Sequence, residues 1–329
     1  MKKKVKNIFA IVIVVIIATL SIDIGSVCET KAATLNKPAV EKHTAKEIRN
    51  FIKKNPVDTS QCSYKAEPKT TGSYSAGELS AETLKNALNA VNQMRYIAGL
   101  PSDVKLNSDY TKAAQAATLV NAANNTISHS PSKPGGMKDS LYELGYSGAS
   151  SSNLGWGYSS PADNVFRGWM RDADSGNIDR VGHRRWVLHS KLKETGFGMA
   201  GTFTAMKVFD TGSYDFSESK YKGIVWPAQT TPVGYFRSDD PWTVSMGDDV
   251  DVSKVKVVLV RKRDNKKWVF SEKKADGYFN VNNDGYGDTG CIIFRPDNLD
   301  DITSKDKFSV KITGLSSGTF KYTVKFFDC

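Results

Sequence analysis

The spacing of hydrophobic residues changes once along this chain, close to Gly223. Upstream, apolar residues recur every three or four positions, as on one face of a helix. The clearest helical run consists of Leu84, Leu88, Val91, Met94 and Ile97. Downstream, apolar and polar residues alternate, most strictly over 308–312 and 320–326, which is typical of strands with one buried face. The pattern predicts an α+β chain, with a mixed domain over 79–213 and an all-β sandwich over 223–329.

Two capping signals and one alanine-rich segment place the helices of the mixed domain. Ser80 is the expected N-cap before an acidic first turn, and Ser108 starts an alanine-rich helix suited to close packing. Ser160 is followed by proline at the first helical position, and we expect this helix to continue through Trp169 and Asp172. Beyond it, short apolar segments indicate strands at 186–188, 196–200 and 203–209.

The first residues are typical of a secretory signal peptide, which we place at 1–32. Lysines precede an apolar run over 8–20, and small residues follow near Ala32. The run is shorter than the roughly 20 residues of a spanning helix, although an uncleaved anchor stays an alternative. No second apolar segment of that length follows. We therefore expect a secreted protein, extracellular or associated with the cell envelope, without a membrane span after cleavage.

Residues 33–78 are polar and rich in Thr, Ser, Lys and Pro, with one short helix expected at 45–54. We interpret this stretch as a linker or arm between the signal peptide and the mixed domain.

The positive charge favours an anionic partner outside the cell. Cleavage after residue 32 removes five lysines and two acidic residues, so the formal net charge falls from +10 to +7. The remaining excess is spread along the chain, apart from a basic segment at 261–267. A nucleic-acid-binding protein would concentrate its charge, so that class is not expected. Association with an anionic cell wall fits, and so does a simple role in solubility.

Three cysteines remain after cleavage: Cys62, Cys291 and Cys329. Export permits one disulfide. A Cys291–Cys329 bond is the favoured pairing, because both residues lie in the C-terminal region, and Cys62 is the alternative partner for either. No spacing of Cys and His indicates a structural zinc site.

A candidate site comes from two histidines and one carboxylate in separate segments. His129 follows the second helix, Asp172 follows Trp169, and His183 stands in Gly182-His183-Arg184-Arg185-Trp186. Two imidazoles and a carboxylate suit zinc, with open positions left over. Without a metal, the same groups suit a proton relay.

These segments resemble the CAP superfamily, which comprises cysteine-rich secretory, antigen 5 and pathogenesis-related proteins, and most of all its bacterial secreted branch. The matching segments are Asn92-Gln93-Met94-Arg95, Ile127-Ser128-His129, Asn153-Leu154, Trp169 with Asp172, and the segment from Gly182 to Trp186. The resemblance implies an α-β-α sandwich followed by an immunoglobulin-like sandwich of the kind seen on bacterial members.

The resemblance also implies a central cleft with two histidines and two acids, in which the histidine pair of some members binds zinc. His129 and His183 match the histidines, and Asp172 matches the second acid. Ser152 stands where the first acid is expected, so the set is incomplete.

Three functions follow as hypotheses. We favour non-enzymatic binding of a small hydrophobic ligand, a glycan or a surface protein, because no activated nucleophile or oxyanion-stabilising set is visible. The alternatives are a zinc-dependent hydrolase that uses His129, Asp172 and His183, and a structural component of the envelope.

Overall fold

The computed structural model describes residues 39–60, 62–210 and 221–329, so the expected signal peptide lies outside the described residues. The described residues form one compact unit, which falls within Lys37–Cys329. Their helices are α1 (Ala45–Lys54), α2 (Ala81–Ile97), α3 (Ser108–Ala123), α4 (Asp139–Ser150), α5 (Pro161–Asn164) and α6 (Gly182–Val187), with a π-helical turn at Val165–Trp169 and a 3-10 turn at Val233–Tyr235. None of the helices in these ranges has the length and hydrophobicity needed to cross a membrane.

The strands form three sheets of more than two strands and two small ones. The three-stranded sheet has the order β4 (Ser152–Trp156), β7 (Phe203–Lys207), β6 (Phe197–Ala200). The four-stranded sheet has the order β14 (Gly277–Asn282), β15 (Cys291–Pro296), β10 (Trp242–Ser245), β8 (Ile224–Trp226). The six-stranded sheet has the order β13 (Lys274–Ala275), β12 (Lys267–Ser271), β11 (Lys256–Arg261), β16 (Lys307–Leu315), β17 (Gly318–Phe327), β9 (Thr230–Pro232). The small sheets pair β1 (Tyr64–Ala66) with β2 (Glu78–Leu79) and β3 (Lys105–Leu106) with β5 (Glu194–Thr195).

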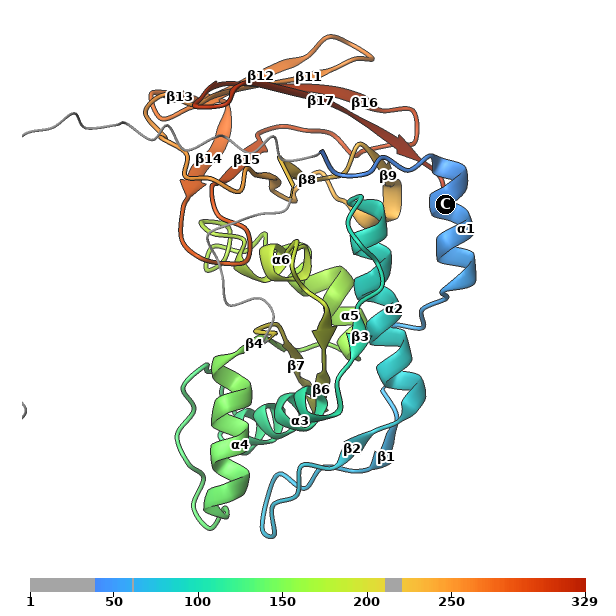
Figure 1. Ribbon diagram of the computed structural model, residues 1–329, viewed down its shortest axis with the longest axis vertical. Helices are drawn as coiled ribbons and strands as arrows, with labels where there is room; N and C mark the ends of the chain where they lie inside the picture. The colour runs from blue at the N-terminus through green and yellow to red at the C-terminus, as the bar shows by residue number, and fades with distance from the viewer. Residues whose placement is uncertain (1–38, 61, 211–220) are drawn as a thin grey trace, which may run out of the picture. The chain divides into compact units, whose positions relative to one another are not determined.

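Helices cover both faces of the three-stranded sheet, which gives the predicted α-β-α arrangement (Figure 1). Successive residues of a strand point to opposite faces. Along β7, Thr204 accordingly bonds to Asn164 of α5, whereas Ala205 packs on Ala114 of α3. The close packing of α3 on the three-stranded sheet needs small residues, because a Cβ on Gly198 of β6 would collide with the α3 backbone. The expected serine caps are present, and the Ser80 and Ser160 hydroxyls each accept a bond from the backbone N–H three residues on.

The two larger sheets form the β-sandwich predicted for the C-terminal region (Figure 1). Its core is aromatic. The Trp242 ring centroid lies 5.9 Å from that of Phe294 in the same sheet and 5.3 Å from that of Phe308 in the opposite sheet. Trp226, Trp242 and Trp268 are all buried, so the large apolar side chains of the alternating pattern are the ones that hold the two sheets together.

The stretch interpreted as a linker is packed where the structure describes it. Its expected helix at 45–54 is present as α1, whose Thr44 cap and Glu47 form a capping box. Ile48 is fully buried, and the Arg49 guanidinium donates bonds of 3.0 and 2.7 Å to the Asp328 carbonyl. This stretch therefore connects the α2 layer to the end of β17.

Two local predictions near the expected site are wrong. The segment at 186–188 is not a strand, because Trp186 and Val187 belong to α6. Both side chains are buried because α6 is enclosed on several sides. Consecutive residues of such a helix can all be apolar, which gives the same sequence pattern as a buried strand. Asp172 does not lie on the helix that contains Trp169. Its backbone φ of 44° is in the left-handed region, where the chain leaves the helix and turns.

The predicted Cys291–Cys329 disulfide is also wrong, since Cys62, Cys291 and Cys329 are all free. Cys291 is buried in β15 of the four-stranded sheet, whereas Cys329 follows β17 of the six-stranded sheet and is exposed. The order of strands separates two residues that lie in the same region of the sequence.

Candidate functional site

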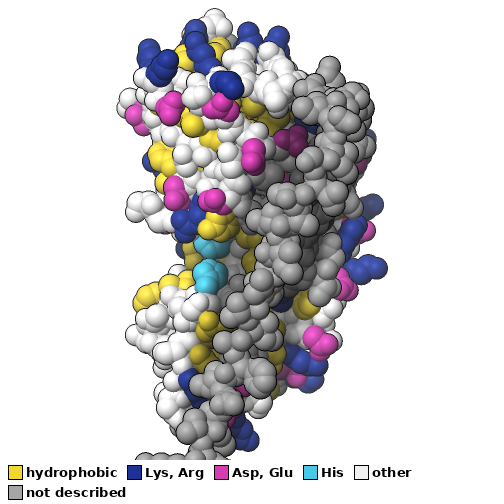
Figure 2. All heavy atoms as spheres, turned by 60° about the vertical axis from the view of Figure 1, so that its left-hand side comes forward, with side chains coloured by type: hydrophobic (Ala, Val, Ile, Leu, Met, Phe, Trp, Pro, Cys, Tyr) yellow, Lys and Arg dark blue, Asp and Glu magenta, His cyan; other side chains and the backbone are white. Residues whose placement is uncertain are grey.

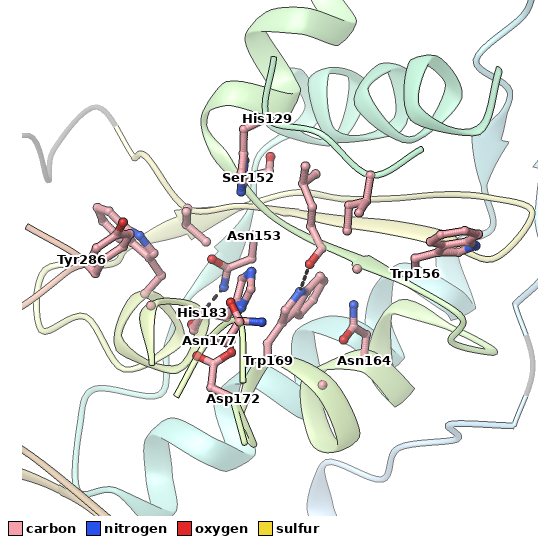
Figure 3. Close-up of a pocket in the computed structure, with 18 of the residues that line it drawn as sticks. His129, Ser152, Asn153, Trp156, Asn164, Trp169, Asp172, Asn177, His183 and Tyr286 are labelled. Carbon is pink, nitrogen blue, oxygen red and sulfur yellow. Dashed lines mark hydrogen bonds and ion pairs between the residues drawn. The ribbon is translucent and has the colours of Figure 1, made fainter. Parts of the chain in front are cut away.

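An open cleft of about 670 Å³ lies beside α6 (Figure 3). Its walls come from the loop at 127–129, from β4, from the segment at 168–183 and from a loop of the β-sandwich. Figure 2 shows histidine side chains in cyan at this hollow, with hydrophobic side chains beside them. The four residues that the sequence assigned to one cleft all line it: His129, Ser152, Asp172 and His183.

Asp172 holds His183 in one orientation. One carboxylate oxygen lies 2.7 Å from His183 Nδ1, and the other accepts a bond of 3.0 Å from the Arg184 backbone N–H. Burial lowers the pKa of His183, but the charge of Asp172 and its hydrogen bond outweigh burial, so the pKa is raised above its ordinary value. Because Nδ1 faces the carboxylate, the neutral ring keeps its proton there and presents Nε2.

His129 is oriented by a backbone carbonyl. Its Nδ1 lies 2.8 Å from the carbonyl oxygen of Ala149, at the end of α4. A carbonyl only accepts, so His129 Nδ1 donates the proton of this bond and the neutral ring again presents Nε2. The cleft thus contains two imidazoles that have the same tautomer for different reasons.

Ser152 opens β4 and is almost fully buried. Its Oγ has no hydrogen-bond partner among the described residues, and neither has Asn164 Oδ1, which also lines the cleft. A buried polar atom without a partner costs about 1–3 kcal/mol. Both atoms are almost inaccessible from the cleft, so a partner in the cleft would reach them only after a local movement of its lining.

The three-ligand zinc site expected at His129, Asp172 and His183 does not fit this geometry. Both oxygens of Asp172 are engaged, with His183 and with the Arg184 N–H, and the carboxylate is buried. In the described part of the chain, no three His, Cys, Asp or Glu side chains are grouped so as to hold a metal ion. Asp172 is placed to orient His183, and zinc binding stays a prediction that would depend on the imidazoles alone.

The residues around α6 explain the other motif positions. The Asn153 side chain donates a bond of 3.0 Å to the His183 carbonyl, and the Trp169 indole donates one of 2.8 Å to the Leu154 carbonyl (Figure 3). Buried Arg95 reaches the other end of α6 and donates to the Val187 carbonyl at 3.0 Å. Each of these groups fixes a backbone carbonyl, so together they hold α6 and β4 in position around the cleft.

The second side of α6 is bound to the β-sandwich. Arg184 donates to the carbonyls of Met170 and Pro241, both at 2.6 Å, and its other terminal nitrogen donates to the Arg171 carbonyl at 2.5 Å. Arg185 bonds to the Asn282 side chain at 2.5 Å. Pro241 and Asn282 belong to the sandwich, so the two arginines next to His183 join the two parts of the chain.

Two aromatic residues of the cleft escaped the sequence analysis. Trp156 is 51% exposed at one end of the cleft, with its ring stacked on Phe203 at 5.1 Å. Tyr286 comes from the sandwich loop after β14 and packs so closely on Gly182 that a Cβ there would lie 2.9 Å from the tyrosine ring. The sequence does offer a signal for Trp156, because it stands between Gly155 and Gly157, directly after the matching segment Asn153-Leu154. Nothing in the sequence links Tyr286 to this site.

The match to one family model agrees with this architecture. Residues 88–209 match the sequence model of the cysteine-rich secretory protein family, CAP. The search of curated proteins gave no significant match. Among solved structures, the chain is similar to an extracellular protein containing an SCP domain from Bacillus anthracis str. Ames, with 14% identity over 51% of this chain and 71% of that one and a TM-score of 0.29. By its motifs, its layers and the family match, the segment 88–209 is a CAP domain.

Proposed function

We propose that this chain is a secreted, non-enzymatic binding protein that takes an oligosaccharide into the cleft beside α6. The observation that carries the proposal is the exposed Trp156 at the rim of an open cleft whose lining is rich in polar residues, Ser152 and Asn164 among them. A sugar presents hydroxyl donors on its edge and C–H groups on its face. Ser152 and Asn164 suit the hydroxyls, and Trp156 suits the apolar face.

The other ligand classes fit the cleft less well. A lipid tail needs a lining that is apolar along its length, whereas His129, His183, Asn153 and Asp172 place polar atoms in the middle of the cleft. A folded protein partner would need a much larger surface than a pocket of about 670 Å³ offers. The part of the proposal that concerns export is supported by the lysines and the apolar run within residues 1–32, which are typical of a signal peptide.

A hydrolase is the second candidate, because Asp172 and His183 form an oriented carboxylate–imidazole pair at 2.7 Å. Such a pair serves as a general base when a nucleophile or a water molecule lies within hydrogen-bond reach of Nε2. Binding stays the first candidate, since the pair equally serves to fix a hydrogen-bonding imidazole in the wall of a binding cleft.

Binding can be tested with the protein lacking residues 1–32 and a panel of soluble peptidoglycan fragments and chitooligosaccharides, followed by tryptophan fluorescence and calorimetry. Trp156→Ala should remove most of the affinity, and Ser152→Val should reduce it. Tyr146→Ala is the matched control, because Tyr146 is an exposed aromatic residue outside the cleft. Equal affinity in Trp156→Ala and Tyr146→Ala, or no binding by any member of the panel, would reject the proposal. Release of a new reducing end during the titration would favour the hydrolase.

A further inference from the structure

The outward face of the six-stranded sheet is formed largely by lysines. Burial alternates along its strands, so every second residue faces outward. The exposed lysines of these strands are Lys256, Lys267, Lys307, Lys311, Lys321 and Lys325. They come from segments far apart in the sequence, and the pairing of β12, β11, β16 and β17 brings them onto one face. We call this surface the lysine face.

No acidic residue balances this charge within the sheet. Its six strands contain neither Asp nor Glu. The ion pairs found for described lysines belong to other residues, among them Lys254 and Lys274, and none involves the six lysines of the face. Figure 2 shows Lys and Arg side chains in dark blue gathered at the upper end of the molecule, where Figure 1 shows this sheet.

The register between β16 and β17 places lysines opposite each other, and this arrangement does not help the sheet to fold. Lys307 lies directly opposite Lys325, and Lys311 lies opposite Lys321. Like charges directly opposite on neighbouring strands destabilise a sheet. Ser309 and Thr323, which also face each other, lie between the two lysine pairs, and a shallow hollow of about 330 Å³ is lined by Lys311, Lys321 and these hydroxyls. Lysine pairs that destabilise the sheet and also line a hollow indicate a surface that binds an anion.

The sequence pattern indicates a different basic region from the lysine face. It singled out the basic segment at 261–267, but Arg261 points inward and pairs with Asp264 at 2.6 Å and Asp300 at 2.9 Å. Arg263 likewise pairs with Asp300 and Asp306. The two arginines of this segment are therefore neutralised, whereas its Lys267 joins lysines from distant segments on the lysine face through strand pairing.

We propose that the lysine face binds a phosphodiester-linked polymer of the cell wall. Lysine is a compact point charge that binds phosphate oxygens without the bidentate geometry of an arginine fork, and this face lacks arginine. The four-residue spacing of Lys307 and Lys311 places charges about 13 Å apart along β16, so a linear polyanion can meet several of them.

Two other polyanionic surfaces fit the lysine face less well. An anionic membrane would be joined by large apolar side chains that insert into it. The exposed large hydrophobic residues of the described chain are Leu106, Ile127, Leu144, Tyr146 and Trp156, and none of them lies on this sheet. Single-stranded nucleic acid would be joined by exposed aromatic residues on which bases stack, whereas the aromatic residue at an outward position of these strands, Phe327, is buried beneath Arg49.

The test uses the protein without residues 1–32 and purified poly(glycerol phosphate) as the probe, with binding measured between 20 and 200 mM salt, a range chosen around the ionic strengths where screening changes most. Binding should weaken steeply with salt. In Lys311→Gln/Lys321→Gln the slope of log affinity against log salt should fall by about 1.4, since each phosphate contact to a flexible strand contributes about 0.7. Because the substitutions remove a like-charge pair, the melting temperature should stay the same or rise.

The control is Lys46→Gln/Lys85→Gln, which makes the same change of net charge at exposed helical positions. An equal loss of affinity in both double variants would overturn the proposal, because total charge alone would then explain binding. Tighter binding to phosphatidylglycerol vesicles or to DNA than to the polymer would also overturn it. Trp156→Ala should bind the polymer like the unaltered protein, so that failure of the cleft proposal and failure of this one are distinguishable.

Discussion

Arg184 should be the most sensitive position between the cleft and the β-sandwich. Its guanidinium is fully buried and donates to three carbonyls that lie in different directions, those of Met170, Arg171 and Pro241, at 2.5–2.6 Å. Arg184→Lys keeps the positive charge but replaces a fork of five N–H donors with one ammonium group on a flexible stem. An ammonium that reaches one of the three carbonyls leaves the other two without a donor.

Each of these lost partners costs about 1–2 kcal/mol, so we expect Arg184→Lys to lower the free energy of unfolding by about 2–4 kcal/mol. For a chain of this size the melting temperature should fall by roughly 3–7 °C. Thermal unfolding followed by circular dichroism, together with urea unfolding at constant m, measures the effect. The control is Arg167→Lys, whose side chain is 62% exposed in its ion pair with Asp163 and should change stability by less than about 0.5 kcal/mol. If the two variants melt alike, the guanidinium does not hold these layers together.

Three further predictions follow from groups near the cleft and in the sandwich. The raised pKa of His183 means that its charged pair with Asp172 stabilises the fold fully below the unfolded-state pKa of about 6.5 and is lost as pH rises through the folded-state pKa. The stability difference between the unaltered protein and Asp172→Asn should therefore be larger at pH 6 than at pH 9, and an equal difference at both values would contradict this assignment. Burial raises the pKa of Cys291, so Ellman's reagent should modify exposed Cys329 first and Cys291 only after unfolding, whereas a disulfide between them would leave neither thiol free. Because Asp172 is engaged by His183 and by the Arg184 N–H, and because the described residues group no third ligand with the imidazoles of His129 and His183, the untagged protein should carry much less than one zinc per chain, and stoichiometric zinc in an elemental analysis would contradict the geometry.

The sequence predicted the elements that depend on local chemistry. Ser80 and Ser160 begin helices because their hydroxyls accept bonds from the backbone within one turn, and such a signal needs no knowledge of the rest of the fold. The alternation at 308–312 identified a strand because period two is a property of the strand itself. His129 and His183 are predicted for a different reason: their residue type makes them candidates together with Asp172, and the resemblance to the CAP superfamily then assigns them to one cleft.

The errors and omissions involve long-range contacts. Trp186 and Val187 were taken for a strand because enclosure of α6 on several sides removes the helical period. Tyr286 could not be predicted, because its place in the cleft depends on how the loop after β14 folds back onto Gly182. The lysine face could not be predicted either, since it depends on the order of four strands and on their register.

The α6 helix unites these observations, because its consecutive residues serve different partners. His183 faces the cleft, while Arg184 and Arg185 reach into the sandwich through buried guanidinium groups. The sandwich in turn contributes Tyr286, which lies in the cleft wall and packs against Gly182. A helix of six residues cannot shift one of these side chains without moving the others. The geometry of the cleft thus depends on the attached sandwich, and a fragment of this chain that ends near residue 213 would lose one wall of the cleft.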